Sequence, residues 1–199
     1  MSKAVLSASA IFLTFAMFAP YIRSIHRGTT KPHVFSWVIW GFGTFIVFFA
    51  QLAGRGGIGA WPIGVSGIIS AYIAIIAFVK RPEFVVTKLD WVFFFVALSA
   101  LPFWFVTSDP LWAVIILTFA DTVGFGPTFR KAYEFPYEES IVFFILSAVR
   151  NSLVILALEH HSFTTVLFPA VVGIGCLLLV CMIAYRRMLV SDPDRSSKL

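Results

Sequence analysis

Charged residues are scarce in this chain, and their scarcity excludes the most common class of protein. Asp, Glu, Lys and Arg make up 13% of the 199 residues, whereas a soluble domain usually contains about 25%. Apolar residues make up 59%, aromatic residues 17%, and the mean hydropathy is +0.92. Because so few polar side chains cannot cover a water-soluble fold, we expect a protein whose solvent is the lipid bilayer.

Cysteines and catalytic motifs are also sparse. The two cysteines, Cys176 and Cys181, lie in one apolar segment, so we expect small buried thiols rather than a disulfide or a metal site. We find no nucleophile with a nearby base, no metal-ligand spacing and no phosphate-binding loop. The sequence therefore predicts that the protein is not an enzyme and holds no cofactor or metal.

Long apolar segments are the dominant feature of the chain. A transmembrane helix needs about 20 mostly apolar residues, and polar turns separate seven segments of suitable length: residues 4–20, 33–53, 60–79, 90–107, 111–127, 140–158 and 163–185. Residues 1–20 look like a signal peptide, but we expect a retained helix because this segment has a counterpart later in the chain. The predicted fold class is an all-α integral membrane protein with seven transmembrane helices.

The distribution of Lys and Arg predicts the orientation of these helices. Of the 15 basic residues, Arg150 lies inside a segment, Lys3 and Arg55 lie on one predicted side, and the other twelve lie on the opposite side. Under the positive-inside rule, this bias places the N-terminus outside and the C-terminus in the cytoplasm of a plasma membrane, or bacterial inner membrane. The net charge of +5 then requires no nucleic-acid partner.

The chain contains an internal repeat at a shift of 107 residues. The shift superimposes Phe18 on Phe125, Pro20 on Pro127, Arg23 on Arg130 and Pro62 on Pro169. The first three segments match the last three, and the fourth has no counterpart. An extra crossing lets the second trio start on the same side as the first, so we expect two parallel three-helix repeats joined by a linker helix. The predicted units are 1–80 (first repeat), 81–110 (linker helix), 111–187 (second repeat) and 188–199 (cytoplasmic tail).

This layout resembles the SWEET and PQ-loop transporter superfamily, although the Pro-Gln signature is Pro20-Tyr21 and Pro127-Thr128 here. The resemblance implies a carrier that works by alternating access around a midplane cavity, with a sugar, an amino acid or a vitamin as its solute. It also implies that Pro20 and Pro127 end their helices and act as hinges. Two trios complete such a pathway, so a monomer or a small homo-oligomer suffices.

Asp121 and Arg150 lie within the fifth and sixth segments. Because charges deep in a bilayer are costly, both should face the protein interior and pair with each other. Two interpretations remain open: a buried ion pair that locks two helices together, and a site that is linked to protons or to the solute. The repeat partners of Asp121 and Arg150 are Thr14 and Gly43, so the charges occur in one half only.

Four further residues are candidates for binding a small polar solute. Ser147 and Asn151 lie four residues apart and share a helix face, which either lines a pocket or forms hydrogen bonds between helices. Trp37 and Trp40 form either an aromatic belt at the membrane interface or a stacking platform. The leading hypothesis is a small-solute transporter in the lipid bilayer. The alternative is a non-transporting receptor, regulator or scaffold of the same shape.

Overall fold

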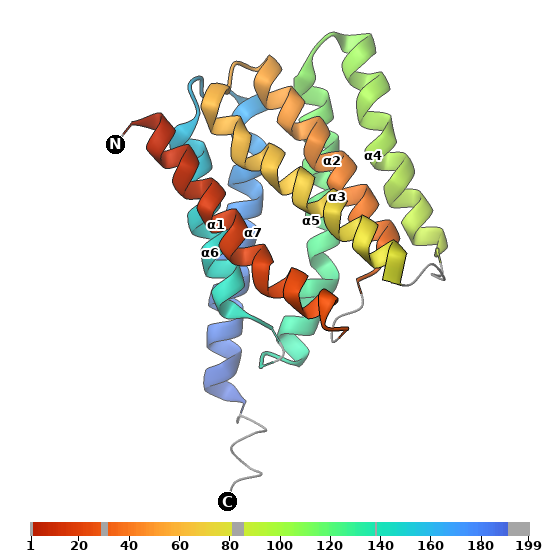
Figure 1. Ribbon diagram of the computed structural model, residues 1–199, viewed down its shortest axis with the longest axis vertical. Helices are drawn as coiled ribbons and strands as arrows, with labels where there is room; N and C mark the ends of the chain where they lie inside the picture. The colour runs from red at the N-terminus through yellow and green to blue at the C-terminus, as the bar shows by residue number, and fades with distance from the viewer. Residues whose placement is uncertain (1, 29–31, 81–85, 138, 191–199) are drawn as a thin grey trace, which may run out of the picture.

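The computed structural model describes residues 2–28, 32–80, 86–137 and 139–190. Regular structure in these ranges is helical throughout (Figure 1). The helices are α1 (Lys3–His26), α2 (Val34–Ala53), the short 3-10 helix η1 (Gly57–Ala60), α3 (Trp61–Lys80), α4 (Lys88–Thr107), α5 (Pro110–Glu134), α6 (Ile141–Ala157) and α7 (Phe163–Leu189). Residues 81–85 of the predicted linker unit and 191–199 of the predicted tail lie outside the described residues.

Length and composition make six of these helices suitable for crossing a membrane, and α6, with 17 residues, is shorter than the rest. Large apolar side chains also cover much of the outer surface of the bundle. Phe12, Ile68 and Phe105 are 70%, 61% and 86% exposed. Exposed apolar surface on this scale suits contact with lipid chains, so the all-helical fold is that expected of a helical membrane protein.

Local signals explain where several helices begin. The Ser2 hydroxyl accepts from the Val5 backbone N–H at 3.3 Å, and Ser140 does the same for Phe143 at 3.3 Å. Before α4, Thr87 and Asp90 exchange side-chain and backbone hydrogen bonds as a capping box. Such caps satisfy N–H groups that the first helical turn leaves without partners.

Two helices continue beyond the prolines that were expected to end them. α1 runs through Pro20 to His26, and α5 runs past Pro127 to Glu134, so this expectation from the sequence is wrong. In α1, packing and capping compensate for the hydrogen bond that proline cannot donate. Ile25 is buried against α3, and Lys80 Nζ donates to the carbonyl oxygens of Ile25 and His26 at 3.0 and 2.6 Å.

By their order in the chain we group α1–α3 and α5–α7, and α4 lies at the edge of the bundle (Figure 1). Within the first group, α3 packs against α1 and α2, and within the second, α7 packs against α5 and α6. Between the groups, α1 packs against α6 and α2 against α5, while α4 packs against α5 and α2. Exchanging α1, α2 and α3 with α5, α6 and α7 keeps the same packing pairs among these six helices, whereas the contacts of α4 have no such counterpart.

The buried apolar side chains form one shared core and two separate ones. We call the end where α1 begins the Lys3 end and the opposite end the His26 end. In the Lys3 half, one core joins both groups, with Ala10, Ile63 and Val154 among its buried members. In the His26 half, Ile25, Ile69 and Ile73 form a core of the first group, whereas a core containing Leu179 belongs to the second. The two groups therefore share a core in the Lys3 half, whereas each has a buried core of its own in the His26 half, where Phe18 and Phe143 still pack together across the groups.

Candidate functional site

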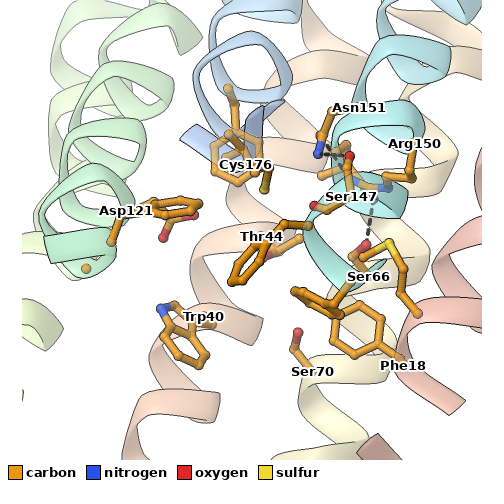
Figure 2. Close-up of a pocket in the computed structure, with 18 of the residues that line it drawn as sticks. Phe18, Trp40, Thr44, Ser66, Ser70, Asp121, Ser147, Arg150, Asn151 and Cys176 are labelled. Carbon is orange, nitrogen blue, oxygen red and sulfur yellow. Dashed lines mark hydrogen bonds between the residues drawn. The ribbon is translucent and has the colours of Figure 1, made fainter. Parts of the chain in front are cut away.

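A cavity of about 290 Å³ lies between the two helix groups (Figure 2). Side chains from α1, α2, α3, α5, α6 and α7 line it. The lining includes all six residues that the sequence singled out for charge or solute binding: Trp37, Trp40, Asp121, Ser147, Arg150 and Asn151. Residues from distant parts of the chain thus converge on one site.

Arg150 on α6 is held by neutral oxygen atoms. Nε donates to Thr14 Oγ1 at 3.2 Å, and Nη1 donates to Asn151 Oδ1 at 3.1 Å. Nη2 donates to the Pro62 carbonyl oxygen at 2.7 Å and to Ser66 Oγ at 2.6 Å. The side chain is only 6% exposed, and none of the described residues gives it a carboxylate partner. Since desolvating a charge costs several kcal/mol, these hydrogen bonds only partly offset its burial.

Asp121 on α5 lines the same cavity from another side (Figure 2). Its carboxylate accepts no hydrogen bond from the described residues. The ion pairs in the described part of the chain are His33–Asp90 and Arg130–Glu134, so the expected Asp121–Arg150 pair is not formed in this structure. The reason is geometric: Arg150 reaches toward α1 and α3, and α5 makes its main contacts with α7, α4 and α2.

The polar face of α6, which carries Ser147 and Asn151, forms part of the cavity wall. Ser147 and Asn151 are 7% and 1% exposed, and both line the cavity. Asn151 Nδ2 donates to the Ser147 carbonyl oxygen at 2.9 Å, while Asn151 Oδ1 accepts from Arg150. The Asn151 bonds therefore stay within α6, and they orient the amide beside the guanidinium.

Sequence reasoning missed five polar side chains in the cavity wall, and these are Thr44, Ser66, Ser70, Thr128 and Cys176. Ser66 and Ser70 lie four residues apart on α3, the same spacing that drew attention to Ser147 and Asn151. This spacing could have identified them. Thr44 and Cys176 are isolated in apolar segments, and their place in the wall follows only from the packing of the helices.

The two tryptophans of α2 pack together at the cavity. The ring centroids of Trp37 and Trp40 lie 5.2 Å apart with an interplanar angle of 89°. Trp37 also packs against Phe18 and Tyr21, with centroid distances of 6.2 and 5.3 Å. The Trp40 side chain is 43% exposed. Both rings thus present aromatic surface to the cavity from a fixed cluster.

A second cavity, of about 570 Å³, adjoins the first toward the His26 end. The two share Met17, Thr128, Phe143 and Phe144 in their walls. Pro20 lines the second cavity, which places this predicted hinge beside the route between the site and the His26 end. The side chain of Pro127, the other predicted hinge, lies outside what the structure describes.

Contacts between the two groups close the Lys3 end. Glu159, in the connection from α6 to α7, donates its backbone N–H to the Gly56 carbonyl oxygen at 3.0 Å and accepts from the Ile58 N–H at 3.2 Å through Oε1. Within the first group, Ser7 Oγ donates to the Ile58 carbonyl oxygen at 2.7 Å and holds η1 against α1. Gly57 has φ +60°, and a Cβ atom there would lie 2.1 Å from Glu159. Glycine is therefore needed for this close approach.

Gln51 and Lys3 add to this closure. Gln51 is fully buried on α2 and donates from Nε2 to the Thr165 carbonyl oxygen of α7 at 2.7 Å. Lys3 Nζ donates to the Leu158 carbonyl oxygen. We call these contacts of Lys3, Gln51 and Glu159 between the two groups the Lys3-end seal.

Comparisons of the chain with protein-family models, with curated proteins and with solved structures find no match. Among its described residues, the chain itself provides a cavity between helices of the two groups, two charges of opposite sign in the cavity wall, and contacts that seal the Lys3 end.

Proposed function

We propose that this protein is a small-solute carrier that works by alternating access, with the cavity as its binding site. The observation that carries the proposal is the position of the cavity: it lies between two helix groups, is sealed at the Lys3 end and continues into a second cavity toward the His26 end. A carrier needs such a site, and it needs two states that open it to opposite sides in turn.

We propose that α1–α3 and α5–α7 are the two parallel repeats, with α4 as the linker. The 107-residue repeat and the exchangeable helix contacts support this arrangement. The resemblance to SWEET and PQ-loop carriers supports it as well. In alternating access, the two groups would rock against each other, and the separate cores of the His26 half would approach while the Lys3-end seal opens.

The basic residues favour a cytoplasmic His26 end in a plasma membrane. By their place in the chain, Arg27, Lys80, Lys88 and Arg186 belong to this end, and Lys3 and Arg55 belong to the other. Under the positive-inside rule, this bias orients the carrier with its N-terminus outside. The structure then corresponds to the inward-facing state.

We propose that Asp121 couples transport to protons. Asp121 and Arg150 are the charged residues that line the cavity, and Cys176 is a third titratable group there. The Asp121 carboxylate lines the cavity and accepts no hydrogen bond from the described residues, so it is available to exchange a proton with the cavity. Arg150 anchors α1, α3 and α6 around the site through its hydrogen bonds.

Two glycines of α5 offer a direct test of the cavity. Gly124 lines the cavity and Gly126 does not, and a Cβ atom at either position would meet no atom within 4 Å. We expect Gly124→Leu to reduce uptake of the transported solute into proteoliposomes by about tenfold or more, because the side chain fills the site. Both substitutions should also favour the helix by up to about 1 kcal/mol.

The matched control is Gly126→Leu, which should retain uptake. Uptake is measured with a panel of labelled sugars, amino acids and vitamins, and thermal unfolding of both variants confirms that they fold. A wild-type protein that moves no solute across the panel, although it is folded and inserted, contradicts the carrier proposal and favours a receptor or scaffold. Equal uptake by the two leucine variants contradicts the assignment of the site.

A further inference from the structure

The cavity wall holds one positive and one negative group, and neither has a partner of opposite charge among the described residues. A guanidinium has five N–H donors, and the described contacts of Arg150 use four of them on neutral oxygens. The remaining donor is on Nη1, beside the Asn151 amide. Unpaired charges in an apolar site are unfavourable, so a ligand that supplies their counter-charges gains binding energy from both.

The two charges lie on different walls of the cavity (Figure 2). Asp121 projects from α5 and Arg150 from α6, and these two helices do not form one of the main packing pairs. A single small anion would neutralise Arg150 and leave Asp121 unpaired, whereas a small cation would do the reverse. A neutral solute would supply a counter-charge to neither group.

The repeat explains why Asp121 lacks a cation from the protein. In the contact between α1 and α6, Arg150 donates to Thr14. The equivalent contact between α2 and α5 places Gly43 in the position of Arg150 and Asp121 in that of Thr14. Gly43 has no side chain, and a Cβ atom there would lie 3.2 Å from Leu117, one turn from Asp121. Among the described lining residues, the fold thus provides a cation on the α6 side of the site and none on the α5 side.

We propose that the solute is a dipolar ion whose carboxylate and cationic group are separated by several bonds. The carboxylate would bind Arg150 Nη1 and the Asn151 amide, and the cationic group would bind Asp121. Trp40 lines the same cavity, and its ring face adds attraction for the cation. This inference rests on the proposed function, because it takes the cavity to be the binding site of a carrier.

The test measures affinities of the purified full-length protein by calorimetry. The ligands are glycine, γ-aminobutyrate, δ-aminovalerate and ε-aminocaproate, a series that increases the distance between the charges. Valerate and n-pentylamine keep the chain and carry one charge each. We expect one of the longer dipolar ions to bind at least about tenfold more tightly than both singly charged analogues, since losing one charge leaves Arg150 or Asp121 without a counter-charge. Glycine should bind more weakly than that ligand.

A variant assigns the cationic end. Asp121→Asn should remove the preference for the dipolar ion over valerate, while Glu134→Gln, on the exposed part of α5, should retain it. Valerate or pentylamine binding as tightly as every dipolar ion overturns the proposal, and so does the absence of binding by any dipolar ion. Glycine binding as tightly as the longer members overturns the separation of the charges.

Uptake into proteoliposomes separates this inference from the proposed function. A dipolar ion that binds but is not transported leaves the inference standing and contradicts the carrier. Transport of a sugar by a protein that binds no dipolar ion supports the carrier and overturns the inference.

Discussion

Arg150 donates a hydrogen bond from Nε to Thr14 Oγ1 at 3.2 Å. Thr14 is the residue that the 107-residue shift superimposes on Asp121. The arginine of one half therefore contacts the neutral counterpart of the acid, and the acid itself is left facing the cavity. Two charges that could have locked the helices together instead remain available to the site.

The geometry of the Arg150 contacts predicts that lysine cannot replace it. Lysine keeps the charge but cannot reach acceptors on α1, α3 and α6 at once, because its ammonium lacks the planar fork of a guanidinium. We expect Arg150→Lys to lower the free energy of unfolding by about 2 kcal/mol, as measured by thermal unfolding in detergent. Arg130→Lys, in an exposed ion pair with Glu134, is the control and should leave the melting temperature nearly unchanged. An equal effect of the two substitutions would contradict the structural role of Arg150.

Proton coupling predicts a specific defect in Asp121→Asn. The amide has the shape of the carboxyl group but cannot exchange a proton, so the response of uptake to an imposed pH gradient should disappear. Uptake is compared in proteoliposomes with and without the gradient, and the protein should unfold at nearly the wild-type temperature. Glu134→Gln on the same helix should respond to the gradient like the wild type. A gradient response that survives in Asp121→Asn would exclude Asp121 as the coupling group.

The hinge assigned to Pro20 predicts that alanine stabilises the protein but slows transport. Alanine restores an N–H donor to the Ala16 carbonyl oxygen, and proline is about 3 kcal/mol less favourable than alanine inside a helix. Pro102→Ala in α4 offers a matched control, since Pro102 also lies inside a helix. Both variants should melt at a higher temperature, and only Pro20→Ala should lose uptake. Equal uptake by the two would remove the hinge from the mechanism.

The Lys3-end seal predicts that Glu159 holds the inward-facing state. Glu159→Ala removes the acceptor of the Ile58 N–H, a loss of about 1 kcal/mol, or roughly fivefold in the equilibrium between two states. In a Cys181→Ser background, an impermeant thiol reagent added from the Lys3 side should then modify Cys176 in the cavity about fivefold faster. The control is His160→Ala, which changes the exposed residue next to Glu159. In this variant, Cys176 should be labelled at the same rate as in the Cys181→Ser background. Unchanged labelling of Glu159→Ala would show that this contact does not gate the site.

Much of the helix order could be predicted from the sequence, because length and apolar composition suffice to identify a membrane-sized helix. The described helices follow the seven predicted segments within a few residues, except where α1 and α5 continue beyond their prolines. The expectation that proline ends a helix failed at Pro20, because contacts of Ile25 and Lys80 with other helices outweigh the lost hydrogen bond. Such contacts are not visible in the local sequence.

The polar and charged residues of the site could also be predicted from the local sequence. Charges and polar residues in an apolar segment avoid lipid, so Asp121, Arg150, Ser147 and Asn151 could be assigned to the interior from the sequence alone. The residues with which they interact could not be predicted from the sequence. The expected ion pair is absent because helix packing directs Arg150 to Thr14, Pro62 and Ser66, and a pairing across the bundle depends on which helices are neighbours.

The sequence by itself determined the number and order of the apolar helices, the 107-residue repeat and the identity of the interior charges, because these depend on composition and spacing. The tertiary structure decided that the two charges remain unpaired in one cavity, that Thr44 and Cys176 line it, and that the Lys3 end is sealed. Each of these depends on distances between helices far apart in the chain, and such distances follow from packing rather than from local sequence.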